Sequence, residues 1–491
     1  MGLEIEHTEF SAEDFVRFRD RLQANLRALN KLLARPGFGE GPLSFGAELE
    51  LYIIDHEAKP LHVNQEIQRR LDDPLLTLEL NRYNLEYNFS PSLVADGCFR
   101  HTQEEAEQAL TRINSVAGDL GGSIVPIGIL PTLQQSDTGY HAMTPLDRYE
   151  ALTNELTEIR GGPFTIAIEG EDTLQLAMDD VTLEGANTSF QIHLRVPPNE
   201  FADFYNAVQL VTPLVVAMAA NSPTLFGHRL WQETRIPLFK QSIDCRPKDS
   251  LHPMPARVNF GNNWIRDGAF ELFSEAALLY RPILPASGDE DPEAVVDSGG
   301  TPALHELRLH QGSIWLWNRP VYDPADGGHL RIELRAFPAG PSIPDMLANA
   351  ALAIGLARVM QDKIKNLIPA IPFTYCIANF YRAAQKGLDA ELFWPSLQQT
   401  QPEYFAVPDI LRKLLPEVPG KLLEMGFIES DFMPLLKIAE ERLETRQTGS
   451  QWQLRRVAEL RKDLHKREAL IAMLLEYQKN SAQNIPVAQW K

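Results

Sequence analysis

Cysteine is scarce in this sequence of 491 residues. Only Cys98, Cys245 and Cys376 are present, and they are far apart and odd in number. A disulfide framework needs paired cysteines, and a CxxC metal or redox site needs closely spaced ones, so the sequence argues against both. Three isolated thiols are typical of a reducing compartment, and we expect a cytoplasmic protein.

Positive charge is also in short supply. The 46 Lys and Arg residues are outnumbered by 66 Asp and Glu residues, which gives a formal net charge of -20. Nucleic acids and anionic membranes bind proteins through basic surfaces, so we expect neither as a partner. This balance still allows a local basic patch for a small anion such as a phosphate group.

Long apolar runs and leader sequences are missing as well. A membrane span needs roughly 18 consecutive apolar residues, whereas the apolar stretches 214–220 and 470–475 are short and typical of core helices. The first ten residues, MGLEIEHTEF, lack the basic start and the apolar stretch of a signal peptide. We therefore expect no membrane segment and no secretion signal.

Several common catalytic motifs are absent or fail on spacing. The sequence has no GxxxxGK[ST] phosphate-binding loop and no nucleophile elbow. In HELRLH, His305 and His310 are five residues apart, whereas the HExxH zinc helix needs a spacing of four. GFGEGP, residues 37–42, precedes a strand pattern instead of a helix, so it predicts a turn and not a dinucleotide site.

What the sequence does contain is a strand with two carboxylates in one row. Residues 45–55, FGAELELYIID, alternate, so that Glu48 and Glu50 share one face and the apolar residues share the other. Their side chains are then roughly 7 Å apart. Like charges at that spacing repel strongly where water is excluded, so either the row faces solvent or a cation lies over it.

Three further segments repeat this design, with apolar residues on one face and polar residues on the other. Their polar rows are Asn84, Glu86 and Asn88; Gln191, His193 and Arg195; and Arg331, Glu333 and Arg335. One interpretation is a solvated face of an antiparallel sheet. Solvated strand faces favour Thr, Ser and Lys, however, and here Glu, His, Asn and Arg dominate. On one shared sheet, these carboxylates and the imidazole could hold Mg²⁺ or Mn²⁺, while arginines bind phosphoryl oxygens.

Helical periodicity predicts helices on either side of these strands. The predicted segments are 11–33, 104–116, 201–220, 345–367 and 450–479. Residues 286–303 are rich in Gly, Pro, Ser and Asp, which predicts a mobile loop, with a lid over the site as one interpretation. Beyond about residue 342 the pattern is predominantly helical.

Five segments together resemble the bacterial glutamate-cysteine ligase and carboxylate-amine ligase family, which shares the glutamine-synthetase catalytic fold. In chain order they are FGAELELYIID, YNLEYNFSPS, SFQIHLRVP, AANSPTLFG and LRIELRAFPAGPS. The similarity spans about residues 45–361. It implies an α+β fold with a curved, mainly antiparallel sheet, a polar metal-binding concave face and helices on the outer face. Residues 1–372 would form the catalytic domain, and 373–491 a helical C-terminal region packed on it.

The resemblance also implies the roles of the polar residues. The metal ligands would be Glu48, Glu50, Glu86, His193 and Glu333. Arg335 would face the transferred phosphate, and Arg235 would contact substrate or phosphate. Apart from the resemblance, Arg195 and Arg331 lie in the same polar rows as the ligands, so we expect them to bind ATP together with Arg335. Where the family often has His-x-His, this sequence has Gln191 and His193, so one histidine is missing.

The activity implied is an ATP-dependent ligation that needs Mg²⁺ or Mn²⁺. The γ-carboxylate of glutamate would attack the γ-phosphorus of ATP, and an amine would then displace phosphate from the acyl phosphate to form an amide. The expected partners are ATP, glutamate and an amine, with cysteine the leading candidate, and a homo-oligomer is left open. Three alternatives stand beside it: a ligase with another acceptor, a metal-dependent hydrolase, and an inactive relative that binds Mg-ATP.

Overall fold

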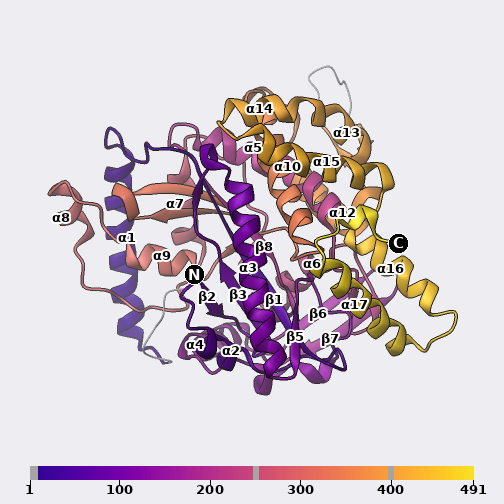
Figure 1. The fold of residues 1–491 in the computed structure, drawn as a ribbon. Coiled ribbons are helices and arrows are strands. Elements are labelled where there is room, and N and C mark those ends of the chain that lie inside the picture. The colour runs from indigo at the N-terminus through magenta and orange to yellow at the C-terminus, as the bar shows by residue number, and fades with distance from the viewer. Residues whose placement is uncertain (1–8, 247–253, 396–402) are drawn as a thin grey trace.

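A single eight-stranded sheet forms the centre of the protein (Figure 1). The computed structural model describes residues 9–246, 254–395 and 403–491. Most of the first ten residues, from which we expect no secretion signal, therefore lie outside the described ranges. The strand order is β13-β14-β8-β1-β3-β2, with β4 and β5 also paired to β1. All pairings within this sheet are antiparallel.

The central sheet is built from strands of very different length. Its members are β1 (Ser44–Asp55), β2 (Leu76–Leu78), β3 (Asn84–Asn88), β4 (Ser92–Leu93), β5 (Gly122–Val125), β8 (Phe190–Arg195), β13 (Asn318–Asp323) and β14 (His329–Leu334). Four small two-stranded sheets lie outside it: β6 (Phe164–Glu169) with β7 (Thr173–Met178), β9 (Thr224–Leu225) with β10 (His228–Arg229), β11 (Val258–Asn259) with β12 (Trp315–Leu316), and β15 (Glu391–Phe393) with β16 (Tyr404–Ala406).

Helices make up most of the rest of the described chain, especially toward the C-terminus. They are α1 (Ala12–Leu33), α2 (Asn64–Leu71), α3 (Cys98–Asp119), α4 (Asp147–Arg160), α5 (Phe201–Ala219), α6 (Arg235–Ser242), α7 (Ala269–Leu279), α8 (Pro292–Asp297), α9 (His305–Gln311), α10 (Ile343–Gln361), α11 (Ile364–Leu367), α12 (Phe373–Lys386), α13 (Val407–Leu414), α14 (Val418–Glu424), α15 (Glu429–Thr445), α16 (Gly449–Leu460) and α17 (Lys466–Ala482).

The alternation expected for β1 is present in the structure. Phe45, Leu49 and Leu51 are fully buried on the helix-covered side, where α3 packs against β1, while Glu48 and Glu50 lie half-buried on the other side. Apolar burial drives this choice of face, because a shift of one residue would bury both carboxylates among the core side chains. The predicted α+β fold, with a curved antiparallel sheet and a helical C-terminal region, is confirmed.

Two long apolar helices, α5 and α10, pack against each other in the core. By length and mean hydropathy, both helices could cross a membrane. We did not expect this from the sequence, because neither segment contains a long uninterrupted apolar run. Their most apolar windows are 89% and 94% buried within the fold. Helices buried in this way are the central layer of a globular core, and they account for the shortage of polar residues in these two segments.

Three predicted segments differ from the structure. The helix expected over 345–367 is divided, because α10 ends at Gln361 and α11 begins at Ile364. The helix expected over 450–479 is interrupted, because His465 starts a new helix: its backbone N–H donates to the Glu468 carboxylate at 2.9 Å. The expected mobile loop at 286–303 contains α8, and ion pairs join it to α1, including Lys31 to Asp297 at 2.8 Å. This segment is therefore docked on α1 in the structure.

The C-terminal region is joined to the central part of the fold by buried polar contacts. Arg442 on α15 pairs with Asp345 on α10 at 2.7 Å, and both side chains are almost fully buried. Asp345 also accepts a hydrogen bond from the Val487 backbone at 2.9 Å. Buried charges need such partners, so α15 and the C-terminal end pack on α10 in one defined arrangement. The domain boundary at residue 372 stays a prediction.

Candidate metal and phosphate site

The polar rows of four strands meet on one face of the sheet. Strand β8 lies between β1 and β14, and β3 lies on the other side of β1. The antiparallel register then places acidic and polar residues directly opposite one another: Glu333 with His193, Glu48 with Gln191, and Glu50 with Glu86. Side chains of directly opposite residues lie about 5 Å apart at their Cβ atoms, so this register forms a continuous acidic face.

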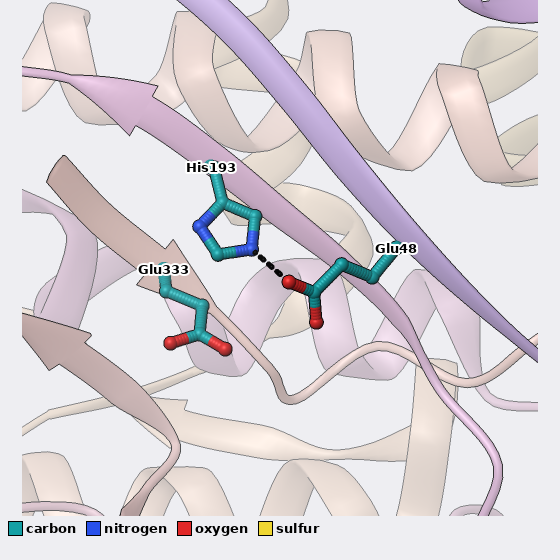
Figure 2. Close-up of side chains that lie close together, drawn as sticks. All are labelled: Glu48, His193 and Glu333. Carbon is teal, nitrogen blue, oxygen red and sulfur yellow. Dashed lines mark hydrogen bonds and ion pairs between the residues drawn. The ribbon is translucent and has the colours of Figure 1, made fainter. Parts of the chain in front are cut away.

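Glu48, His193 and Glu333 form the tightest group on this face (Figure 2). One ligand atom from each lies within 4.8 Å of the others, and all three residues are shielded from solvent. His193 Nε2 lies 3.0 Å from Glu48 Oε1. Within the described part of the chain, His193 Nδ1 is buried without a hydrogen-bond partner. Two carboxylates and an imidazole at this spacing fit a divalent cation.

Glu50 and Glu86 form a second acidic pair next to this group. The Glu50 carboxylate accepts hydrogen bonds from the Ser189 backbone at 2.7 Å and from Gln191 Nε2 at 2.9 Å. Glu86 accepts one from Asn88 Nδ2 at 3.0 Å. Both carboxylates are thus held in place by neutral donors, which orient them without neutralising their charge.

Within the described part of the chain, the arginines near this end of the face do not outweigh burial and the mutual repulsion of its carboxylates. Burial and the neighbouring carboxylates raise the pKa of Glu50 to about 8 and that of Glu86 to about 7. Two more residues belong to the same group: burial and Glu50 raise the pKa of Glu79 to about 7, and burial and Glu79 raise that of Glu184 to about 8. Four carboxylates that resist ionisation together form an environment in which cations bind favourably.

These raised pKa values predict a stability loss at high pH when no metal is present. The folded protein holds protons on Glu50, Glu79, Glu86 and Glu184 that the unfolded chain releases near pH 4.5. The stability they contribute is therefore complete at low pH and is lost as the pH rises to about 8. In EDTA, we expect the thermal unfolding midpoint to be lower at about pH 8.5 than at about pH 6. Added Mg²⁺ should raise the midpoint more at the higher pH.

Scanning calorimetry at several pH values checks this expectation. A matched Glu86→Gln variant removes one of the four titrating groups, so its midpoint should depend less on pH in EDTA. A wild-type midpoint that is flat or rises over this range without metal would contradict the charge imbalance.

Arg335 lies beside the carboxylates, just beyond the end of β14. Its Nη1 donates to Glu333 Oε1 and to Gln191 Oε1. Arg319 on β13 binds the same Glu333 with two nitrogens, at 2.5 Å and 3.0 Å. Burial alone would raise the pKa of Glu333, but Arg319 and Arg335 outweigh it and bring that pKa to about 2. Glu333 is therefore ionised and firmly oriented.

The other predicted arginines make no hydrogen bond to these carboxylates in the described chain, although the charge of Arg235 acts to lower the pKa of Glu50. Arg195 and Arg331 face each other further along the same face, where Arg195 donates to the Glu40 carbonyl at 2.9 Å and Arg331 pairs with Asp323 at 3.2 Å. Arg235 is only 2% exposed and donates to the Glu233 carboxylate at 3.2 Å. Their contacts with ATP or substrate stay predictions.

Several residues of the site were missed from the sequence. Arg319 precedes Pro320 in a short alternating segment, and its partnership with Glu333 depends on the hairpin that β13 and β14 form. Glu79 lies in LTLEL, whose alternation is a usable signal, but β2 is only three residues long. Glu184 begins a three-residue 3-10 helix, Glu184–Ala186, before β8, and so short an element offers no periodic signal.

Comparison with known proteins finds one family match and similar solved structures. A family model described as glutamate-cysteine ligase family 2 matches residues 44–418. Among solved structures, the chain is similar to a bifunctional glutathione synthetase from Pasteurella multocida, with 12% identity and a TM-score of 0.50 over 93% of this chain and 55% of that one. It is also similar to the glutamate-cysteine ligase of Francisella tularensis in complex with AMP, with 12% identity and a TM-score of 0.48 over 92% and 91% of the two chains.

These findings differ in what they establish. The sequence has no significant match among curated proteins. The likeness to the Pasteurella multocida protein shows a shared fold alone, and this chain spans about half of that protein's length. The family match covers most of the chain, including β1, β3, β8 and β14.

Proposed function

The chain belongs to glutamate-cysteine ligase family 2, and from this premise we propose that it joins the γ-carboxylate of glutamate to the amine of cysteine. Membership makes it an ATP-dependent carbon–nitrogen ligase that uses a divalent cation and small-molecule substrates. The identity of the acceptor, the acyl-phosphate intermediate and the choice of Mg²⁺ or Mn²⁺ belong to the proposal. So does a cytoplasmic location, which the three free, buried cysteines support.

One observation carries the proposal: Glu48, His193 and Glu333 converge within 4.8 Å next to Arg335. A hydrolase with paired carboxylates would account for the acidic face, but it gives no role to the two arginines that hold Glu333 ionised. An acidic, oriented face beside a guanidinium fits the transfer of a phosphoryl group between two anions.

We propose that Glu48, Glu50, Glu86, His193 and Glu333 hold Mg²⁺ or Mn²⁺ on this face. The bound cations would screen the charge of the ATP phosphates, which otherwise repel an attacking carboxylate. Glu333 is kept ionised and oriented by its arginines, and Glu50 is oriented by the Ser189 backbone and Gln191. The ligands are thus already placed before any substrate arrives.

Arg335 then acts on the transferred group. Its Nη1 is engaged by Glu333 and Gln191, and among the described residues nothing accepts a hydrogen bond from its Nε or Nη2. These nitrogens would donate to the phosphoryl oxygens as the glutamate carboxylate oxygen bonds to the γ-phosphorus and ADP leaves. The amine nitrogen would next attack the acyl carbon, lose a proton and release phosphate.

The test is phosphate release from ATP in the presence of Mg²⁺, glutamate and a panel of amines, with the product identified by mass spectrometry. We expect turnover with glutamate and cysteine, and a product in which the γ-carboxyl is joined to the cysteine amine. Turnover with a different amine would change the acceptor. Hydrolysis without ATP, or Mg-ATP binding with no turnover on any acceptor, would contradict the ligase assignment in favour of a hydrolase or an inactive relative.

We also expect Mg²⁺ or Mn²⁺ to support activity and Zn²⁺ to fail. The proposed ligands are four carboxylates and one imidazole, and hard oxygen donors suit Mg²⁺ and Mn²⁺, which keep water molecules for exchange with phosphates. Exhaustive chelation should abolish turnover, and back-titration with each metal should restore it for Mg²⁺ and Mn²⁺ only. Full activity of the chelated enzyme would remove the metal from the mechanism.

A further inference from the structure

Among the residues that the structure describes, Gln191 is the neutral side chain that bonds both to Arg335 and to Glu50 at the acidic end of the site. It lies on β8, directly opposite Glu48, and is only 1% exposed. Its Oε1 accepts from Arg335 Nη1, while its Nε2 donates to Glu50 at 2.9 Å. Both ends of one amide are thus occupied, the oxygen by a guanidinium and the nitrogen by a carboxyl group.

The chemistry of these contacts specifies the orientation of the amide. A guanidinium only donates hydrogen bonds, so the amide oxygen must face Arg335, and this leaves the amide nitrogen to face Glu50. Without this spacer, Arg335 would lie next to Glu50 as well as Glu333, and a guanidinium pairs strongly with a carboxylate. An Arg335–Glu50 pair would occupy both a proposed metal ligand and the nitrogens meant for phosphate.

We propose that Gln191 is a positioning residue for phosphoryl transfer: its amide holds Arg335 toward the transferred group and keeps it from pairing with Glu50. This inference rests on the proposed function and adds a role for a residue outside the proposed metal ligands and phosphate-binding arginines. It predicts that Gln191 acts through Arg335, so the effects of changing the two residues should overlap.

Binding of Mg-ADP with and without aluminium fluoride tests this directly, because the fluoride complex mimics a phosphoryl group in transfer. In the wild type we expect fluoride to tighten Mg-ADP binding. In Gln191→Met, which has a similar size and no amide, Mg-ADP alone should bind within about threefold of wild type, while the tightening by fluoride should fall by a factor on the order of 10 or more. Turnover should fall with little change in the KM for ATP.

Three variants make the result specific. Arg335→Lys should lose the fluoride effect as Gln191→Met does, and the double variant should lose little more than either single one. Gln191→Glu keeps a polar side chain in the fold, but its carboxylate competes with the phosphoryl anion for Arg335, so it should lose the effect too. Gln478→Met is the matched control: Gln478 donates to Ser123 and Ile124, remote from the acidic face, and its loss should leave the fluoride effect intact.

The possible outcomes separate this inference from the proposed function. Wild-type fluoride tightening in either Gln191 variant, or additive losses in the double variant, would overturn the role of Gln191. A wild type that shows the fluoride effect but ligates no amine would overturn the proposed acceptor and leave the Gln191 comparison decisive. A wild type that binds no Mg-ADP would overturn both.

Discussion

Arg335→Lys is expected to lower turnover by a factor on the order of 100 or more while Mg-ATP binding survives. Lysine keeps the positive charge but has no planar fork, so it cannot engage Glu333 and Gln191 with one nitrogen while it presents others to the phosphoryl group. The loss should therefore appear in kcat, since the interaction is made chiefly during transfer. Steady-state kinetics and calorimetric titration of Mg-ATP measure the two effects separately.

Arg358→Lys provides a control for the chemical change itself. Arg358 lies near the end of α10, partly buried, and pairs with Asp362 at 2.8 Å. Its replacement should change the free energy of unfolding by no more than about 0.5 kcal/mol and leave turnover alone. If Arg335→Lys behaved in the same way, the polar row of β14 would be an ordinary amphipathic strand face and the proposed site would be wrong.

Glu333→Gln should be more severe, because it affects binding, turnover and stability together. The side chain is fully buried between Arg319 and Arg335, and removal of its charge leaves two guanidinium groups without their shared partner. Breaking a buried ion pair from one side costs about 3–5 kcal/mol of unfolding free energy. Loss of a metal ligand should also weaken Mg-ATP binding and lower turnover, which distinguishes this variant from Arg335→Lys.

Asp345→Asn separates the stability effect from the functional one. Asp345 is also fully buried and pairs with an arginine, Arg442, but it lies on α10 where the C-terminal region docks. Its loss should lower the unfolding midpoint to a similar degree, while the protein that stays folded should still bind Mg-ATP. A Glu333→Gln protein that keeps wild-type Mg-ATP binding would show that Glu333 supports the fold and holds no metal.

The polar rows of the four strands could be predicted because each depends only on residues close together in the sequence. Alternation in a strand depends only on the backbone, and the choice of face follows from apolar burial, so the sides occupied by Glu48, His193 and Glu333 could be read from the sequence. The break between α16 and α17 was harder to predict from the sequence. The end of α16 and the start of α17 depend on the capping of His465 by Glu468, a weaker signal than the apolar periodicity that continues across the break.

The residues that complete the site could not be found in this way. Glu184 lies in a three-residue 3-10 helix, and only the folded structure brings it near Glu79. Arg319 is one of many arginines in the sequence, and its pairing with Glu333 exists only in the β13–β14 hairpin. Arg235 is the opposite case. The sequence suggested it as a site residue, and in the structure it is buried and paired with Glu233.

By itself, the sequence determined the four amphipathic strands, their polar faces and the family to which they belong, because these depend on short-range periodicity and on motifs of adjacent residues. The tertiary structure decided which polar residues meet. Strand order and register place Glu333 opposite His193 and Gln191 between Arg335 and Glu50, and these pairings join segments far apart in the chain. Such contacts follow from the packing of the whole core, which no single segment specifies.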